Sequence, residues 1–245
     1  MNSENKLKEQ VGKNIIITGA GRGIGKGLAE KYASKGYNLF LCSRSEKTLL
    51  KSAEEIRQKN KNSMVLTYAA DLKDKSQAQA FGRWILEKDF SIDILINNAG
   101  DFLPGSIYNE EDGVLENMIE INLYSAYHLT RALLPKMMDQ KHGHIFNMCS
   151  IASLQAYASG GSYSISKFAL MGFSKNLREE MKPYNIKVTA VYPGAVYTSS
   201  WAGSGVQPDR IMRVEDIAEI IYSISQLSPQ ACAEDIVLRP QYGDL

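Results

Sequence analysis

The chain has 245 residues, of which 44% are hydrophobic and 22% charged, with a formal net charge of +1. This balance suits one domain spanning residues 1–245 and excludes the bulk charge that would favour nucleic acid or a membrane surface. The three cysteines lack a paired spacing, the N-terminus lacks the apolar core of a signal peptide, and no apolar run reaches the roughly 18 residues of a membrane span. We therefore expect a cytoplasmic protein without nucleic-acid or membrane partners.

A glycine-rich turn follows the first apolar segment. Residues 14–18 form a short β-branched run typical of a buried strand, and residues 26–35 have the pattern of a helix. The glycines between them let backbone N–H groups approach a pyrophosphate at the positive end of the helix. The spacing T-G-x-x-x-G-x-G differs from the general G-x-G-x-x-G fingerprint, and a tight turn without a ligand is the alternative. The predicted dinucleotide contacts are Thr18, Gly19, Gly21, Arg22, Gly23, Ile24 and Gly25.

The second predicted strand, residues 37–42, indicates which dinucleotide binds. Strands at this position usually end in Asp or Glu when the cofactor is NAD, because the carboxylate binds the ribose 2′-hydroxyl. Here Ser43 and Arg44 follow instead. Arg44 and Arg22 can clamp a 2′-phosphate by bidentate hydrogen bonding, although two solvated arginines are the alternative. We predict NADP(H), with contacts from Ser43 and Arg44.

Two further segments are expected at the cofactor crevice. A helix over 46–59 precedes a third strand over 64–69, which leads to Asp71 and Leu72. Asp71 can accept from the adenine amino group, cap the predicted helix over 73–88, or do both. The fourth strand, 92–96, is followed by an amide-rich and small-residue turn, where an Asn-rich turn without a ligand is the alternative. The predicted contacts from these segments are Asp71, Leu72, Asn98, Ala99 and Gly100.

A loop over 101–112 leads to a long predicted helix over 113–138. Asn122 falls in the middle of this helix, where asparagine has poor propensity and needs a reason to be present. One possibility is a kink that binds water, and the other is a packed polar side chain with a backbone partner.

The next two segments carry the candidate chemistry. A fifth strand, 144–149, ends at Ser150, whose hydroxyl can donate to a substrate oxygen or cap its own backbone. In the predicted helix over 161–181, Tyr163 and Lys167 are four residues apart and share one face. An ammonium beside the phenol would lower the tyrosine pKa from its usual ~10, so that the hydroxyl can give and take back a proton. No histidine has metal-ligand spacing, and we expect no metal.

The C-terminal third completes the alternation of strands and helices. A sixth strand is predicted over 186–192, a helix over 215–226 and a last strand over 235–238, with a mobile lid over about 197–214. About seven strands alternating with helices imply a doubly wound α/β domain of the Rossmann type, in which helices cover both faces of a parallel sheet.

These motifs together resemble those of the short-chain dehydrogenases/reductases that prefer NADP, and the resemblance spans essentially the whole chain. The motifs in chain order are Thr18-Gly19-x-x-x-Gly23-x-Gly25, Asn97-Asn98-Ala99-Gly100, Asn122, Ser150, Tyr163-x-x-x-Lys167 and Pro193-Gly194. The resemblance implies an NADPH-dependent reductase of a small-molecule carbonyl compound. It also implies a homodimer or homotetramer that pairs through the two long helices, and cofactor contacts from Tyr163, Lys167, Pro193, Gly194, Val196 and Thr198.

The resemblance further implies a catalytic tetrad. Tyr163 would protonate the carbonyl oxygen as hydride arrives from NADPH, and Lys167 would lower the tyrosine pKa and hold the nicotinamide ribose. Ser150 would orient and polarise the carbonyl group, and Asn122 would hold a water molecule in the proton relay.

The substrate is suggested by the C-terminal residues 234–245, which are similar to the ending of bacterial sepiapterin reductases. Aromatic residues Tyr157, Tyr192, Tyr197 and Trp201 are expected to border the pocket, where a flat pterin can stack, although lid packing also explains Trp201. The predicted substrate contacts are Ser150, Tyr157, Tyr163 and Trp201. A 3-oxoacyl-carrier-protein reductase, a general ketone reductase and a non-catalytic NADP(H)-binding regulator are the alternatives.

Overall fold

Seven parallel strands form a single sheet in the order β3-β2-β1-β4-β5-β6-β7. The structure is a computed structural model, and it describes residues 12–201 and 204–244. The strands are β1 (Asn14–Thr18), β2 (Asn38–Ser43), β3 (Val65–Ala69), β4 (Ile94–Asn97), β5 (Gly143–Met148), β6 (Ile186–Pro193) and β7 (Asp235–Leu238). The predicted parallel sheet of a doubly wound single domain is confirmed.

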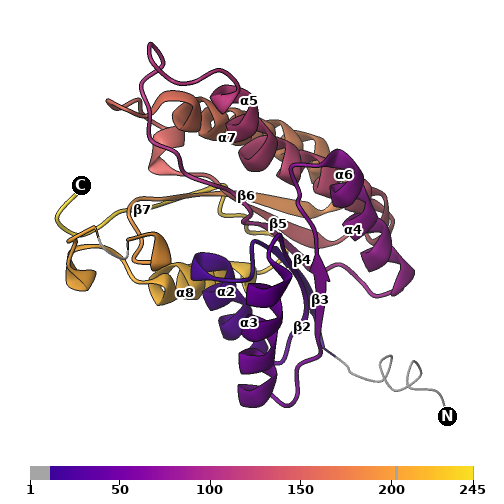
Figure 1. The fold of residues 1–245 in the computed structure, drawn as a ribbon. Helices are drawn as coiled ribbons and strands as arrows, with labels where there is room; N and C mark the ends of the chain where they lie inside the picture. The colour runs from indigo at the N-terminus through magenta and orange to yellow at the C-terminus, as the bar shows by residue number, and fades with distance from the viewer. Residues whose placement is uncertain (1–11, 202–203, 245) are drawn as a thin grey trace.

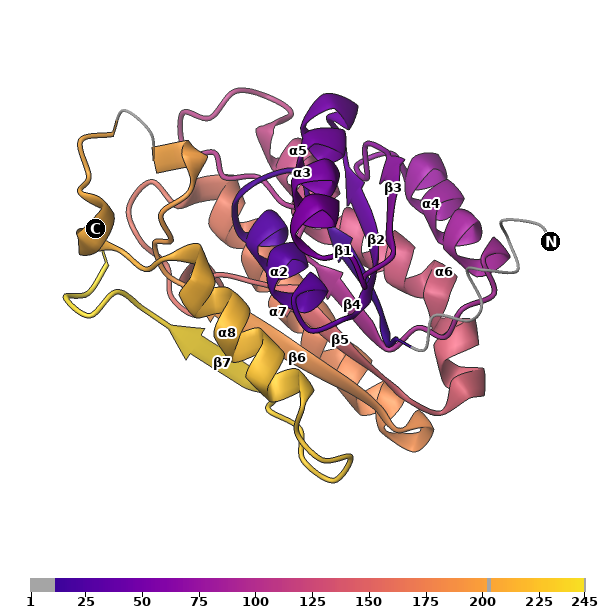
Figure 2. The same ribbon diagram turned by 90° about the horizontal axis from the view of Figure 1, so that it is seen from below.

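Helices cover both faces of the sheet, as Figures 1 and 2 show. One face carries α2 (Gly23–Ala33), α3 (Glu46–Lys59) and α8 (Val214–Ser225). The other carries α4 (Lys75–Glu87), α5 (Val114–Ile119), α6 (Ser125–Gln140) and α7 (Gly161–Met181). Short helical turns are η1 (Glu120–Tyr124), η2 (Ile151–Ser153), η3 (Lys182–Tyr184), η4 (Ser199–Trp201) and η5 (Pro208–Arg210).

Strand β1 illustrates why the sheet forms where the apolar runs lie. Ile15 and Ile17 pack into the core beneath α2, α3 and α8, whereas Ile16 between them packs into the core beneath α4, α6 and α7. All three side chains are buried because successive residues of a strand point to opposite faces and helices cover both. Fully burying one such side chain contributes roughly 1.5–3 kcal/mol, which favours a continuous apolar strand over an alternating one.

Two helices begin at least two residues away from their predicted starts. Helix α2 begins at Gly23, inside the glycine turn, rather than at residue 26. Helix α4 begins at Lys75, and its capping carboxylate is Asp74, which accepts from Ser76 N at 2.7 Å and Gln77 N at 3.4 Å. The alternative that Asp71 caps this helix is therefore wrong, because Asp74 is the aspartate that stands next to the first turn.

The predicted helix over 113–138 is continuous but not uniform. Its middle, η1, is a π-helical turn between α5 and α6, and Asn122 lies within it. Such single-turn π bulges are uncommon and often occur at functional sites. Within the described residues, no helix combines the length and apolarity needed to cross a bilayer.

The arrangement of the strands locates the crevice of the fold. The chain builds outward from β1 to β2 and β3, and then returns to place β4 on the other side of β1. In doubly wound sheets, ligands bind outside the carboxyl ends of the strands at such a reversal. Thr18 ends β1 and Asn97 ends β4, so the glycine turn and residues 98–100 meet at this point.

Candidate active site

The glycine turn after β1 has the geometry of an anion-binding loop. Gly19 and Gly23 adopt φ of +66° and +54°, which side chains rarely tolerate, and a Cβ at Gly25 would lie 2.3 Å from Gly19 O. The first turn of α2 holds no acidic residue, and its N-cap Arg22 makes no capping hydrogen bond with its side chain. The positive end of α2 is thus left for a phosphate, which fits a dinucleotide.

Thr18 and Asn98 join the two strands at the crevice. The Thr18 hydroxyl accepts from the backbone N–H groups of Asn98 at 2.9 Å and Ala99 at 2.8 Å. The Asn98 side chain donates back to Thr18 O at 2.9 Å. Both residues therefore fix the relative position of β1 and β4, and their contacts with a cofactor stay predictions.

The residues predicted to select NADP(H) gather at the end of β2. The N–H group of Ala20 donates to Cys42 O at 3.0 Å, and a Cβ at Gly21 would lie 3.0 Å from Ser43 Oγ. Arg22 and Arg44 directly follow Gly21 and Ser43 in the chain, and both are exposed. Both guanidinium groups are therefore accessible to a bound phosphate, which they can hold by bidentate hydrogen bonds.

Asp71 and Leu72 lie next to the same strand end. Ala70 N donates to Ser43 O at 3.2 Å, which holds the start of this segment against β2. The Asp71 carboxylate accepts from the N–H group of Lys73 at 3.2 Å, whereas Leu72 is buried in the core. Contact between Asp71 and an adenine group stays a prediction, and the side chain of Leu72 serves the core.

Ser150 and Tyr163 meet directly at the carboxyl end of β5. The Ser150 hydroxyl lies close enough to the Tyr163 phenol to lower its pKa. Ser150 also accepts from Ala152 N at 3.1 Å and begins the short helix η2, so it caps its own backbone as well. The interpretation that Ser150 caps its own backbone is therefore confirmed, and donation to a substrate oxygen stays a prediction.

Lys167 lies beside Tyr163 but does not act on it as predicted. The lysine is buried, its Nζ donates to Met148 O at 2.9 Å, and it stands 5.9 Å from the centre of the Tyr163 ring. Burial raises the pKa of Tyr163 to about 12, although the nearby Ser150 hydroxyl partly lowers it. The direction of this pKa is therefore opposite to the predicted one, because desolvation of the phenolate is its largest cause.

Asn122 connects the π-helical turn to the loop after β4 and to helix α7. Its Oδ1 accepts from Asp101 N at 2.9 Å, while its Nδ2 donates to Asp101 O at 3.1 Å and to Ser166 Oγ at 2.9 Å. A Cβ at Gly100 would lie 2.7 Å from Asn122 Oδ1 and 3.4 Å from Lys167 Nζ, so the three residues are adjacent. The backbone partner expected as one alternative is present, and the water relay stays a prediction.

Sequence reasoning missed Phe102. Its ring packs edge-on against the ring of Tyr163 with centroids 4.8 Å apart, although 55% of the residue is exposed. The segment from 101 to 112 has no periodicity from which the direction of a side chain could be deduced. Its only signal is position, because Phe102 directly follows the turn at the end of β4.

The predicted substrate residues are only partly brought together. Tyr157 is half-exposed and lies close enough to Tyr163 to raise its pKa slightly. Trp201 belongs to η4, where its N–H group donates to Thr198 O at 3.0 Å, and no described contact joins it to Tyr163. Tyr192 cannot border a pocket as expected, because it is fully buried and its hydroxyl donates to Asp235 Oδ1 at 2.6 Å.

The segment after β6 approaches the glycine turn. Pro193 ends the strand, Gly194 N donates to Leu238 O at 2.8 Å, and Val196 is buried and pairs with Met212. A Cβ at Gly23 would lie 3.4 Å from the methyl group of Thr198, which places this threonine beside the predicted cofactor loop.

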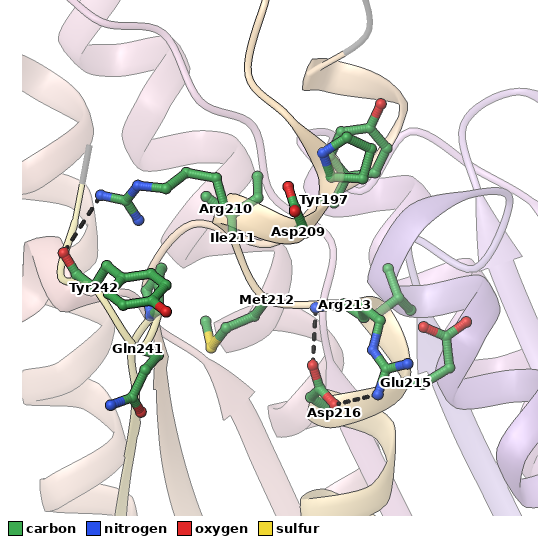
Figure 3. A pocket seen from close by; sticks show the side chains of 13 residues that line it. Tyr197, Asp209, Arg210, Ile211, Met212, Arg213, Glu215, Asp216, Gln241 and Tyr242 are labelled. Carbon is green, nitrogen blue, oxygen red and sulfur yellow. Dashed lines mark hydrogen bonds and ion pairs between the residues drawn. The ribbon is translucent and has the colours of Figure 1, made fainter.

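A hollow of about 700 Å³ lies between the predicted lid and the C-terminal segment (Figure 3). The lid is tied to this segment, because Arg210 donates to Gly243 O at 3.0 Å and to Tyr242 O at 3.4 Å. None of the four predicted catalytic residues lines the hollow. Its lining is Tyr197, Pro208, Asp209, Arg210, Ile211, Met212, Arg213, Val214, Glu215, Asp216, Pro240, Gln241 and Tyr242.

The sequence and the structure are both similar to those of known oxidoreductases. The family model of the short chain dehydrogenases matches residues 13–207. A sepiapterin reductase of Chlorobaculum tepidum is 31% identical over 239 residues, covering 94% of this chain and 97% of that protein. An alcohol dehydrogenase of Thermococcus sibiricus, solved with 5-hydroxy-NADP, superposes with a TM-score of 0.87 at 27% identity, covering 95% of this chain and 98% of its own.

A second solved structure is the L-sorbose reductase of Gluconobacter frateurii with NADPH and L-sorbose. It has a TM-score of 0.85 and 26% identity, and the match covers 93% of this chain and 95% of that one. The resemblance seen in the motifs is thus confirmed over nearly the full length. The chain belongs to the short-chain dehydrogenase/reductase family of oxidoreductases.

Proposed function

We propose that this enzyme is an NADPH-dependent carbonyl reductase whose proton donor is Tyr163. The observation that carries the proposal is the grouping of Tyr163 with Ser150, whose hydroxyl lowers the pKa of the phenol, and with the buried Lys167, whose Nζ stands 5.9 Å from the centre of the Tyr163 ring. This group stands at the carboxyl edge of the sheet, at which the glycine turn also opens. A hydride donor and a proton donor can therefore reach the same carbonyl group.

The electrostatics of the site favour reduction. A pKa of about 12 keeps the Tyr163 hydroxyl protonated at neutral pH, so it holds the proton that a reduced carbonyl oxygen needs. In the proposed mechanism, the neighbouring Ser150 hydroxyl orients the substrate oxygen. NADPH, when bound, supplies the hydride.

Lys167 and Asn122 complete the proposed machinery. Lys167 keeps its Nζ in a fixed place through Met148 O, from which it can also hold a ribose hydroxyl. Asn122 sets the start of the loop after β4 through both backbone groups of Asp101, and its predicted relay water would sit beside Lys167.

NADP(H) is the proposed cofactor because of the end of β2. The chain continues there as Ser43-Arg44, without the Asp or Glu that would repel a 2′-phosphate at this position, and Arg22 and Arg44 are exposed. Two solved relatives contain NADP-type molecules, which supports the same choice.

Replacing Arg44 with Ala tests the choice of cofactor. We expect the Kd for NADPH to rise by about 10- to 100-fold, which corresponds to loss of a charge-assisted pair, and the Kd for NADH to stay nearly constant. Fluorescence titration of both nucleotides measures this, with Arg83→Ala as a control because Arg83 is exposed on α4. Equal losses for the two nucleotides would show that Arg44 does not contact the phosphate.

For the substrate we propose the side-chain ketone of a pterin or a similar flat ring. The sepiapterin reductase relative supports this, and so do the aromatic side chains of Phe102 and Tyr157 near Tyr163. A planar ring can stack on such groups, whereas a carrier-protein thioester needs a basic entrance. Trp201 is proposed as a lid residue that reaches the substrate when segment 197–214 closes.

The direct test is NADPH oxidation by the purified enzyme with sepiapterin and an acetoacetyl thioester measured in parallel. Preference for sepiapterin supports the pterin proposal. Preference for the thioester would assign the enzyme to reduction of 3-oxoacyl groups. Tight NADPH binding without oxidation across a panel of ketones and aldehydes would instead indicate a non-catalytic regulator.

A further inference from the structure

The loop between β4 and α5 is joined to the first turn of α7 by one carboxylate. Glu110 Oε1 accepts from Ser162 N at 3.0 Å, and Glu110 Oε2 accepts from the hydroxyl of the same serine. Glu110 is half-buried, and it is 52 residues distant from Ser162 in the sequence. Ser162 directly precedes Tyr163, so this contact is one residue from the proposed proton donor.

Helix α7 supplies no capping side chain of its own. Its N-cap is Gly160, which has no side chain, and its first turn holds no acidic residue. Glu110 therefore provides both the hydrogen-bond acceptor and the negative charge that the N-terminus of a 21-residue helix favours. Hydrogen bonds to a carboxylate are also stronger than neutral ones.

Two glycines leave room for this contact. A Cβ at Gly161 would lie 2.0 Å from Glu110 Oε1 and 2.5 Å from Gly105 O, and Gly161 adopts φ of +39°. Gly105 N in turn donates to Ser159 O at 3.1 Å. The loop and the helix start are thus closely fitted, and side chains at either glycine would separate them.

The loop is held at both ends. Asn122 binds the backbone of Asp101 at its start, and Glu110 binds Ser162 near its end. Between them, Phe102 packs on the ring of Tyr163. Helices α5 and α7 lie side by side above the sheet in Figure 1, so the loop enters α5 alongside the helix that carries Tyr163.

We propose that Glu110 is a positioning residue of the reductase. It holds the first turn of α7 and the loop after β4 in a fixed relative position. The Tyr163 hydroxyl then stays beside Ser150, and the Phe102 ring stays packed against the Tyr163 ring. The proposal rests on the proposed carbonyl reductase function. Glu110 does not contact the reacting atoms, and its effect reaches them through Ser162 and Phe102.

The test compares Glu110→Ala, Glu110→Gln and the neighbouring Glu111→Ala, because Glu111 is exposed and carries the same charge. We expect Glu110→Ala to lower kcat by about 10- to 100-fold, since misplacing a catalytic group by 1 Å can cost about 100-fold. The Kd for NADPH, measured by fluorescence titration, should remain constant. Glu110→Gln keeps an acceptor and should recover most of kcat, and Glu111→Ala should match the wild type.

Hydrogen exchange followed by mass spectrometry reports on the link without any substrate. Glu110→Ala should raise exchange in peptides covering 101–113 and 159–166 together, with α3 unchanged. Unchanged exchange would overturn the proposal, and so would raised exchange with wild-type kcat. If the wild-type enzyme reduced no carbonyl compound, the reductase proposal would fail, and the exchange result alone would decide whether Glu110 joins the loop to α7.

Discussion

Burial of the charged Lys167 side chain destabilises the folded protein. Burial lowers its pKa to about 8 from the usual 10.5, and the nearby Cys149 opposes this only in part. The folded state therefore holds its proton less tightly than the unfolded state does. The resulting cost is fully present below pH 8 and amounts to about 3 kcal/mol; it is relieved as the pH rises from about 8 to 10.5.

Replacing Lys167 with Met should consequently stabilise the protein at neutral pH. Loss of the hydrogen bond to Met148 O costs about 1 kcal/mol. We therefore expect the free energy of unfolding to rise by about 1–2 kcal/mol at pH 7. The gain should shrink by pH 9.5, where the wild-type lysine is already neutral, and denaturant unfolding at both pH values measures it. A variant less stable than the wild type at pH 7 would contradict this account of the buried ammonium.

The residues of the site also show how far sequence alone reaches. Spacing predicts that Tyr163 and Lys167 share a helix face and that Ser150 ends a strand at the crevice, and the family resemblance predicts that the three act together. The direction of the tyrosine pKa was not predictable. It depends on how much water the fold removes from Tyr163, and no local pattern carries that quantity.

At the scale of elements, the π-helical turn is the feature that departs most from the sequence pattern. Apolar spacing predicts a regular helix across it, and the bulge depends instead on side-chain bonds from Asn122 to the backbone of Asp101 and to Ser166. These partners are 21 and 44 residues away, so local propensity cannot reveal them. By contrast, helices α3 and α7 match their predicted bounds, since apolar periodicity is local.

Asn122→Ala should lower the free energy of unfolding by about 2–3 kcal/mol, because it leaves buried partners of the amide unsatisfied. Asn176→Ala is a matched control: Asn176 is exposed on α7 and its amide bonds only within the helix, to Gly172 O at 2.9 Å. Chemical denaturation of both variants measures the difference. Equal and small losses would indicate that Asn122 does not hold the π-helical turn in place.

The loop between β4 and α5 marks the limit of prediction at this scale. It contributes Phe102 to the site and Glu110 to the start of α7, yet it contains no apolar periodicity. Its glycines and proline indicate a loop without indicating which way each side chain points. Tertiary contacts decide that, and they require the fold.

At the scale of the whole molecule, α5, η1 and α7 present apolar side chains to the surface. Those at least one-third exposed are Leu115, Tyr124, Ile165 and Phe168. We predict that copies of the chain pair through this face, as the family resemblance implies, because burying such a face stabilises a dimer. Light scattering after size-exclusion chromatography should give a dimer or tetramer, and Phe168→Lys should shift it toward the monomer. A monomeric wild-type protein at micromolar concentration would contradict the prediction.

Tyr163 is the proposed proton donor in NADPH-dependent carbonyl reduction. This role can be tested by stopped-flow measurement of NADPH oxidation with the wild type and with Tyr163→Phe. We predict that the variant binds NADPH with unchanged Kd and reduces the carbonyl substrate about 10³-fold more slowly, within the range typical of a lost general acid. Wild-type turnover by Tyr163→Phe would contradict the account.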